Sequence, residues 1–353
     1  MGLFDDALKD SESLFLNEIM LDFSYQPKLV RFRENQQKYM ASCILPLLQK
    51  RNGKNLLITG TPGVGKTVCC RHVLTELKEY EEDIILLYLN CWKKDTSYKL
   101  ALEMCALLGY KWVHNKRTDE LFNEIKEIIN KKNLVIVLDE VDKLQDFQIL
   151  YFLVEEIYRK SMFLITNEKG WASELEDRLK SRLILDTLEF NPYTLDETKE
   201  ILRERVRYAF VKGVFDETAF ELVAQKAFEL NDIRTGLFLL REAGNIAERK
   251  ALRRIGIEHA QIAISQLGDY QKREIDKMED DEKEIIELVK LNSGKNAQEL
   301  LDIYKKDISL RTLQRKLDDL AKGGVILKEE AVSDQGAKVF VFKYGSLKRL
   351  DEF

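Results

Sequence analysis

The stretch LLITGTPGVGKTVCC, residues 56–70, decides the fold class of this chain. It runs from apolar residues into the pattern G-x-x-x-x-G-K-[ST] at residues 60–67 and then continues as an expected helix. Between a strand and a helix, the glycines of such a loop let backbone N–H groups surround phosphates. Lys66 is expected to reach the outer phosphates, and Thr67 to offer a hydroxyl to Mg²⁺. The sequence therefore predicts a site for ATP or ADP with Mg²⁺, because a plain glycine-rich turn would not account for the Lys-Thr pair.

Further apolar runs surround this loop and predict a sheet. They are NLLIT at 55–59, IILLYLN at 84–90, LVIVLD at 134–139, SMFLITN at 161–167 and LILDTLEF at 183–190. Runs that are apolar at every position are typical of strands covered on both faces, and amphipathic helical stretches separate them. The pattern indicates a parallel α/β sheet.

The pattern changes along the chain and predicts three domains. After residue 190 only helical periodicity remains, as far as about residue 267, and a highly charged stretch follows. That stretch is either a helical linker or an exposed helix. The expected parts are an α/β nucleotide-binding domain (1–190), a helical lid domain (191–268), a linker (269–281) and a third domain (282–353).

Composition restricts the class of protein further. The chain has 353 residues, 45% of them hydrophobic and 33% charged, with a formal net charge of -5, so any nucleic-acid surface must be a local patch. Five cysteines show no metal-ligand spacing and are expected to be reduced and mostly buried. No signal peptide or membrane-spanning run is apparent, so we expect a cytoplasmic, nucleoid-associated protein with no membrane partner.

Polar residues end two of the expected strands. Asp139 and Glu140 follow one apolar run; the first is expected to hold the metal ion and the second to polarise the attacking water. Asn167 ends the next run, where it is expected to hold the attacking water or the γ-phosphate. The alternatives are solvated turn residues for the acids and a helix cap for Asn167.

The order of these features resembles that of the AAA+ ATPases. The resemblance implies an arginine finger at Arg182, which completes the site of a neighbouring subunit, with Arg178 as a competitor for that role. It also implies a lid arginine at Arg234 that reaches the γ-phosphate. Each of these residues is otherwise an ordinary surface arginine.

Within that superfamily the chain resembles the archaeal origin-recognition initiators, relatives of the eukaryotic origin-recognition and cell-division-cycle ATPases. The resemblance rests on FSYQPKLVRFRENQ (23–36) and on segments 87–109, 138–144, 190–206 and 255–264. It implies that Tyr25, Pro27, Arg33, Glu34 and Gln37 lie beside the adenine base. The complete set of nucleotide contacts expected is Tyr25, Pro27, Arg33, Gly60, Thr61, Pro62, Gly63, Val64, Gly65, Lys66, Thr67, Val68, Tyr193 and Arg234, with Thr67 and Asp139 at the metal ion.

The segment that begins at Asn90 corresponds to the insertion that distinguishes these initiators and that, by resemblance, touches DNA. The contacts expected there are Lys93, Lys94, Thr96 and Tyr98. The alternative is that Leu100, Met104 and Leu107 simply pack this helix on the sheet while its lysines are solvated. Both interpretations can hold on opposite faces of the helix.

The third domain looks like a winged helix-turn-helix. Helical patterns cover 282–291, 296–306 and 309–324, and strand-like runs at 325–332 and 338–345 form an expected hairpin. In the third helix Leu310, Leu313, Leu317 and Leu320 form a core-facing stripe, with Ser309 as N-cap and Gly323-Gly324 as the stop.

The opposite face of this third helix is expected to enter the major groove of duplex DNA, with the wing along the backbone. Lys305 and Lys306 precede the helix. The alternative is a protein-interaction domain with solvated charges. The expected DNA contacts of this domain are Ser309, Arg311, Thr312, Gln314, Arg315, Lys316 and, on the wing, Lys338.

Together these features predict an ATP-dependent initiator of DNA replication in which ATP binding and slow hydrolysis act as a switch. The implied partners are double-stranded origin DNA, identical or paralogous initiator subunits, and the MCM replicative helicase. One alternative is a clamp-loader or helicase-loader ATPase, which would not be expected to end in a winged helix. The other is a DNA-binding regulator whose nucleotide is structural.

Overall fold

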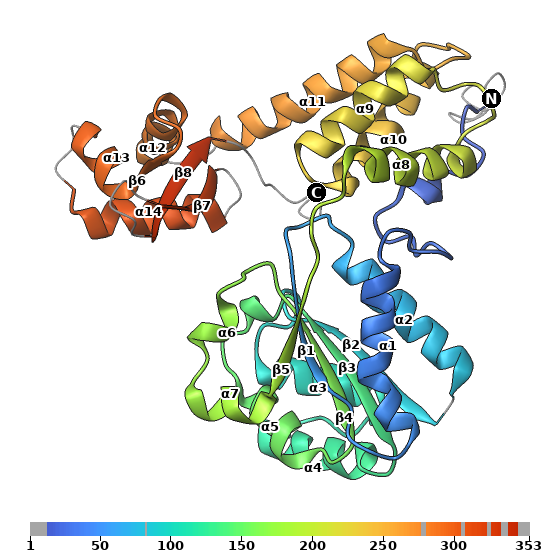
Figure 1. Cartoon of the computed structure of the whole chain (residues 1–353), viewed down its shortest axis with the longest axis vertical. Helices are drawn as coiled ribbons and strands as arrows, with labels where there is room; N and C mark the ends of the chain where they lie inside the picture. The colour runs from blue at the N-terminus through green and yellow to red at the C-terminus, as the bar shows by residue number, and fades with distance from the viewer. Residues whose placement is uncertain are drawn as a thin grey trace. The chain divides into compact units, whose positions relative to one another are not determined.

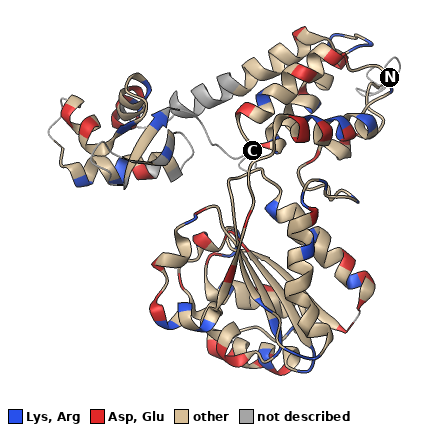
Figure 2. Cartoon of the chain, in the orientation of Figure 1, with Lys and Arg blue, Asp and Glu red and all other residues tan. Residues whose placement is uncertain are grey.

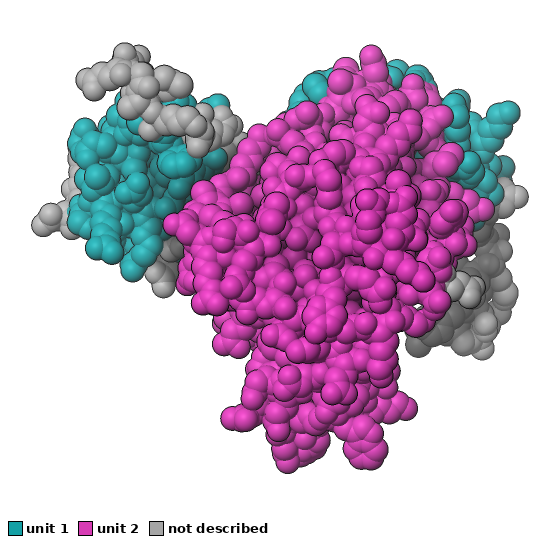
Figure 3. Space-filling model, turned by 60° about the horizontal axis from the view of Figure 1, so that its bottom comes forward, with its two compact units in different colours: residues 1–21, 205–230, 234–353 teal, residues 22–204, 231–233 magenta. Residues whose placement is uncertain are grey.

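The computed structural model of the chain describes residues 13–81, 83–276, 280–304, 308–322, 326–332 and 338–344. It forms two compact units, coloured separately in Figure 3. One comprises residues 22–204 with 231–233, and the other comprises residues 1–21, 205–230 and 234–353.

The unit that comprises residues 22–204 with 231–233, magenta in Figure 3, is the predicted α/β domain (Figure 1). Its five strands are all parallel and lie in the order β2-β3-β4-β1-β5. The strands agree closely with the five apolar runs of the sequence. Their bounds are β1 (Asn55–Thr59), β2 (Ile84–Asn90), β3 (Asn133–Asp139), β4 (Lys160–Ile165) and β5 (Leu185–Glu189).

Helices cover both faces of this sheet, which explains why its strands are apolar throughout. Because side chains alternate along a strand, Leu134, Ile136 and Leu138 enter one core while Val135 and Val137 enter the other. The first core is closed by α3 (Ser97–Leu107), α4 (Thr118–Ile129), α5 (Gln148–Glu156) and α7 (Asp177–Leu183), and the second by α1 (Glu34–Leu48) and α2 (Lys66–Tyr80). The remaining short elements are a 3-10 helix at Val141–Lys143 and α6 (Trp171–Glu174).

The lid is helical, as predicted. It consists of α8 (Leu195–Ala209), whose residues up to Glu204 group with the α/β unit, and of α9 (Glu217–Glu229), α10 (Ile233–Arg249) and α11 (Ile257–Asp276). Helix α11 continues through the described part of the expected linker, so that part is helical.

A segment near the N-terminus packs on the lid, whereas the sequence analysis placed it in the α/β domain. Phe15 pairs with Phe210, their rings 4.7 Å apart, and a 3-10 helix follows at Glu18–Leu21. Gly244 permits this packing, because a Cβ there would lie 2.4 Å from Cζ of Phe15.

The last domain has the predicted order of three helices and a hairpin. Its sheet has the order β6-β8-β7, and the two-residue strand β6 was not anticipated. One expected core residue is wrong, since Leu310 is 36% exposed whereas Leu313 and Leu317 are fully buried. The elements are α12 (Asp280–Leu291), β6 (Lys295–Asn296), α13 (Ala297–Ile303), α14 (Leu310–Lys322), β7 (Ile326–Val332) and β8 (Lys338–Tyr344). The expected stop at Gly323-Gly324 lies outside the described residues.

The cysteines, the charged residues and the lengths of apolar helices can each be compared with what the composition predicts. All five cysteines are buried and free, as predicted. Acidic and basic residues are interspersed along the helices of the α/β unit (Figure 2). Across the residues that the structure describes, no helix combines the length and the apolar character needed to cross a membrane.

Candidate nucleotide site and nucleic-acid interface

The predicted phosphate loop connects β1 to α2 with an unusual backbone. Gly63 and Gly65 have φ of 78° and 89°, in the left-handed region that favours glycine. A Cβ on Gly63 would lie 2.2 Å from Oδ1 of Asp232, and one on Gly65 would lie 2.6 Å from the Tyr193 hydroxyl oxygen. Larger side chains do not fit at either position. The loop therefore brings its backbone to the N-terminus of α2, where anions are favoured.

Lys66 joins two parts of the expected site that are far apart in sequence. Its ammonium group donates to the carbonyl oxygens of Gly60 (2.7 Å) and Thr61 (2.9 Å) and to Oδ1 of Asn167 (2.8 Å). The approach of Asn167 follows from the strand order, because β4 lies beside β1 with Ile165 opposite Ile58. Lys66 is only 7% exposed, so its charge is held in place by these oxygens.

The expected metal ligands also meet. Thr67 Oγ1 donates to Oδ2 of Asp139 over 2.8 Å, and Asp139 is 4% exposed. A hydroxyl and a carboxylate form a donor set that suits Mg²⁺, so these residues fit the ion that the sequence predicts. The hydroxyl of Tyr88 also donates to Oδ2 of Asp139. The pKa of Tyr88 is raised, mainly because the ring is buried and also because the negative charge of Asp139 lies beside it. Sequence reasoning missed Tyr88, although it is the one hydroxyl within the apolar run 84–90.

Glu140 occupies a turn immediately after β3. Its backbone is left-handed (φ 57°, ψ 46°), and its N–H donates to Oδ1 of Asp139 over 3.0 Å. The same turn is fixed at Asp142, whose Oδ1 accepts from the hydroxyl of Thr166 over 2.8 Å. Burial would raise the pKa of Asp142, but hydrogen bonding from Lys143 and Thr166 lowers it overall, which keeps this carboxylate ionised.

Arg33 is hydrogen-bonded to the backbone of the phosphate loop. Its Nε and Nη2 donate to the Val64 carbonyl (3.1 and 3.0 Å), and Nη2 also donates to the carbonyl of Asn191 (2.7 Å). The guanidinium carbon lies 3.8 Å from the centre of the Tyr193 ring, and Arg33 is 5% exposed. Contact of Arg33 with an adenine base, and contact of Tyr193 with the nucleotide, stay predictions.

The other expected adenine contacts belong to residues 25–37, and this segment touches the first turn of α2 through Gln26. Gln26 donates through Nε2 to the carbonyl of Val68 (2.9 Å), which places the half-buried Tyr25 and Pro27 on either side of this contact. Gln37 donates to the carbonyl of Val30 (2.6 Å), and Glu34 Oε1 accepts from the Phe32 N–H (3.0 Å). These last two contacts shape the segment itself.

The arginines occupy different surroundings. Arg182 forms an ion pair with Glu155, and Arg178 reaches the same carboxylate at 3.6 Å. The Arg182 and Arg178 side chains are 42% and 68% exposed. Arg234 lies in the first turn of α10, in the unit that also holds most of the lid. The finger and lid roles of these residues stay predictions.

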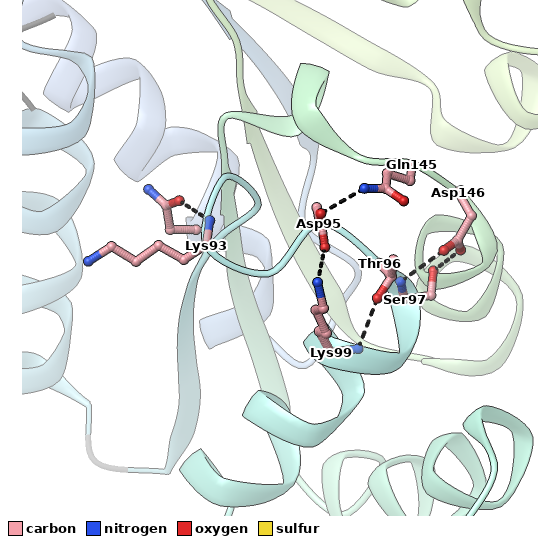
Figure 4. A network of polar contacts seen from close by, with 8 residues as sticks. Lys93, Asp95, Thr96, Ser97, Lys99, Gln145 and Asp146 are labelled. Carbon is pink, nitrogen blue, oxygen red and sulfur yellow. Dashed lines mark hydrogen bonds and ion pairs between the residues drawn. The ribbon is translucent and has the colours of Figure 1, made fainter. Parts of the chain in front are cut away.

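The residues of the insertion segment differ in exposure and in their contacts; Figure 4 draws Lys93, Thr96 and Lys99 among them. Lys93 and Tyr98 are exposed, the latter by 40%, whereas Lys94 pairs with Glu103 at 3.5 Å. Thr96 is the N-cap of α3 and accepts from the N–H of Lys99 at 3.4 Å.

The opposite face of α3 packs on the sheet through Leu100 and Met104, both fully buried. Leu107, which the packing alternative included, is 53% exposed. The loop after α3 is a surface that the sequence analysis did not single out. It carries Trp112, which is 80% exposed, among the exposed basic residues Lys111, His114 and Arg117; the alternation of aromatic and basic residues was the available signal.

In the third domain, α14 presents most of the expected contacts. Arg311, Gln314 and Arg315 are exposed. Ser309 caps the helix, because its Oγ accepts from the Thr312 N–H at 3.2 Å and lies 2.8 Å from the Thr312 hydroxyl. Lys316 does not lie on the open face as expected; it is one quarter exposed and pairs with Asp281 at 2.8 Å. Lys305, Lys306 and the side chain of Lys338 lie outside the described residues.

A parallel five-stranded sheet with a phosphate loop, an acidic strand end and a strand-end Asn, followed by a helical lid, defines a member of the AAA+ ATPases. Family models agree: that of an AAA domain matches residues 49–166, and that of a Cdc6 AAA+ ATPase-type lid domain matches residues 199–265.

Individual relatives define the family more narrowly. ORC1-type DNA replication protein 1 of Methanosarcina mazei is 33% identical over 298 residues, which cover 78% of this chain and 69% of the relative. The ORC1-type DNA replication protein of Pyrococcus abyssi is 32% identical over 299 residues, covering 77% and 70%. The solved structure of the Aeropyrum pernix ORC1 protein in complex with DNA is 25% identical, with a TM-score of 0.71 over 96% of this chain and 95% of that one. The chain belongs to the ORC1-type DNA replication proteins, AAA+ proteins of replication initiation.

Proposed function

We propose that this protein is an ATP-controlled initiator that binds duplex origin DNA and helps to recruit or load the MCM replicative helicase. The observation that carries the proposal is the exposed face of α14, where Arg311, Gln314 and Arg315 project from the third helix of a winged domain. In helix-turn-helix proteins this helix enters the major groove, where Arg and Gln suit the edges of guanine and adenine. The similar Aeropyrum pernix ORC1 protein has been solved in complex with DNA, which supports DNA as the partner in this proposal.

The nucleotide acts as the switch in this proposal. Lys66 and the loop backbone would hold the outer phosphates, and Thr67 and Asp139 would hold Mg²⁺, which would neutralise phosphate charge. Glu140 orients the attacking water, and Asn167 is positioned through Lys66. Hydrolysis is slow and resets the switch, and the lid arginine Arg234 distinguishes the nucleotide states.

Neighbouring subunits complete the site. Arg182 is the proposed finger, and its release from Glu155 is a condition for reaching a nucleotide on another subunit. The pair is partly exposed, so exchanging one partner for another costs about 1 kcal/mol or less. Identical or paralogous initiator subunits are therefore the proposed partners at this surface.

A second DNA surface lies on the α/β unit. The exposed Lys93 in the turn before α3 and the exposed Tyr98 in its first turn combine positive charge with an aromatic ring. Such a combination suits the phosphates and sugars of a nucleic-acid backbone more than a specific base sequence. Sequence preference is assigned to α14.

The test is fluorescence-anisotropy titration of origin-derived and scrambled duplexes over a salt series. The double variant Arg311→Ala/Arg315→Ala is compared with wild type and with Lys290→Ala. The control removes one positive charge from α12, where the Lys290 side chain is 50% exposed. We expect the double variant to lose the preference for origin DNA and to weaken binding by about tenfold or more, since each base contact contributes about 1–3 kcal/mol.

The control is expected to keep the preference. Equal and weak binding of both duplexes by wild type and double variant at every salt concentration would refute DNA recognition by α14. It would instead favour a protein partner for the winged domain.

A further inference from the structure

Two turns at neighbouring strand ends are joined by polar contacts within the α/β unit (Figure 4). The insertion turn comprises residues 90–97, after β2, and the catalytic turn comprises residues 140–147, after β3. The strands are adjacent, with Asn90 opposite Asp139 in the register, and the N–H of Cys91 donates to the carbonyl of Asp139 over 2.8 Å. The proposed DNA contacts Lys93 and Tyr98 thus begin next to the strand end that carries Asp139 and Glu140.

The first connection joins Asp95 to Gln145 twice. The carbonyl of Asp95 accepts from the N–H of Gln145 at 2.8 Å, and its Oδ2 accepts from Nε2 of Gln145 at 2.7 Å. The other carboxylate oxygen accepts from Lys99 at 2.6 Å, a contact within the same segment. Asp95 therefore has one partner, Lys99, in the first turn of the helix that follows it, and another, Gln145, in the catalytic turn.

The second connection is centred on the buried Ser97 and is itself partly buried. Asp146 accepts through Oδ2 from the N–H of Ser97 at 3.1 Å and through Oδ1 from its hydroxyl, whose oxygen accepts from the N–H of Ile149 at 2.8 Å. Ser97 is 1% exposed. Breaking a buried set of this kind costs more than breaking surface contacts, because the groups left behind lack water.

The catalytic turn continues these contacts to the nucleotide site. The N–H of Lys143 donates to the carbonyl of Glu140 at 2.9 Å. Asp142 accepts from Thr166, the residue before Asn167, and Asn167 accepts from Lys66. The Lys143 ammonium lies 5.6 Å from the centre of the Trp92 ring, which adds an aromatic contact to the insertion turn.

We propose that the insertion turn and the catalytic turn move as one body, so that duplex DNA bound at Lys93 and Tyr98 alters the placement of Glu140 and hence the rate of ATP hydrolysis. Ser97 and Gln145 are the positioning residues: they act through Asp146 and Asp95 and touch neither DNA nor nucleotide. This inference rests on the proposed function and adds its regulation. Because coupling between two binding sites is reciprocal, the bound nucleotide must change DNA affinity by the factor with which DNA changes nucleotide affinity.

The experiment measures steady-state ATP hydrolysis with and without saturating duplex DNA, and the Kd for DNA in ADP and in a non-hydrolysable ATP analogue. The test variant is Ser97→Ala/Gln145→Ala, and the single variant Gln145→Ala alters only an exposed position. The matched control is Lys99→Ala, which removes the partner of Asp95 that lies on its own helix. Ser97→Thr keeps the hydroxyl and serves as the conservative replacement.

In wild type we expect saturating DNA to change kcat by more than about twofold, and the DNA Kd to differ between the two nucleotide states by about fivefold or more, a usual size for coupling between binding sites. In the double variant we expect a change of less than about twofold, together with loss of the nucleotide dependence of the Kd, while Lys99→Ala and Ser97→Thr behave as wild type. Gln145→Ala is expected to lose part of the coupling, because its backbone contact with Asp95 remains. A merely structural role would lower kcat equally with and without DNA and leave the ratio intact.

Three outcomes would overturn the inference. The first is full coupling in both the double variant and Gln145→Ala. The second is wild-type protein that binds DNA with no change in kcat or in nucleotide-dependent Kd, which refutes the coupling and leaves the proposed function standing. The third is wild-type protein that binds no duplex DNA, which refutes the proposed function and the coupling with it.

Discussion

Replacing Arg33 by Ala should destabilise the α/β unit strongly, because this buried cation holds the phosphate loop. The substitution removes the donors to three carbonyl groups, those of Phe32, Val64 and Asn191, and the stack on Tyr193. Hydrogen bonds from a charged donor are each worth about 1.5–3 kcal/mol, and a partly buried cation–π contact about 1 kcal/mol. Subtracting the cost of burying the guanidinium, we expect a loss of about 3 kcal/mol in the free energy of unfolding.

The assay is thermal unfolding of the whole chain, in which the transition of the α/β unit is the one that ATP with Mg²⁺ raises. For a unit of this size 1 kcal/mol shifts Tm by about 2–4 °C, so the expected decrease is about 6–12 °C. Arg31→Ala is the control two residues away, where the side chain is 50% exposed and pairs with Glu200 at 3.2 Å, and it should shift Tm by less than about 3 °C. A shift in Tm below about 2 °C for Arg33→Ala, or equal shifts for both variants, would show that the contacts of Arg33 do not stabilise the α/β unit by this amount.

Two further predictions concern a helix cap and a thiol. Ser309→Ala removes the side-chain acceptor for the Thr312 N–H and should lower the stability of the winged domain by about 1 kcal/mol, measured by amide exchange in α14; unchanged exchange there would contradict it. Burial raises the pKa of Cys69 from its ordinary value of 9.0 to about 12, so its contribution to stability is complete below pH 9 and is lost as pH rises from 9 towards 12. Urea unfolding at pH 8 and pH 10.5 should show this decrease, and Cys69→Ala should reduce it; an identical pH dependence in the variant would rule out Cys69 as its source.

The contacts and the exposure of several side chains could not be predicted from the sequence, because they depend on packing between distant segments. For Arg33 the sequence predicts a place beside the adenine base, and the structure adds its contacts with the Val64 and Asn191 carbonyls and the Tyr193 ring. Lys316 was expected on the open face of α14, but it pairs with Asp281 of α12. Leu107 and Leu310 have the spacing of core residues and are nevertheless 53% and 36% exposed. Helical periodicity identifies a face, but it does not show where the neighbouring element stops covering that face.

The sequence by itself determined the class of fold, the strands and the nature of the nucleotide site. A strand covered on both faces must be apolar at every position, and a phosphate loop needs glycines followed by Lys and Thr, so both leave local patterns. Only the tertiary structure decided which distant residues meet. Asn167 reaches Lys66 because β4 lies beside β1, and Ser97 reaches Asp146 because β2 lies beside β3. Strand order is a property of the whole packed sheet, whose lateral neighbours are far apart in the chain, and no local pattern of residues specifies it.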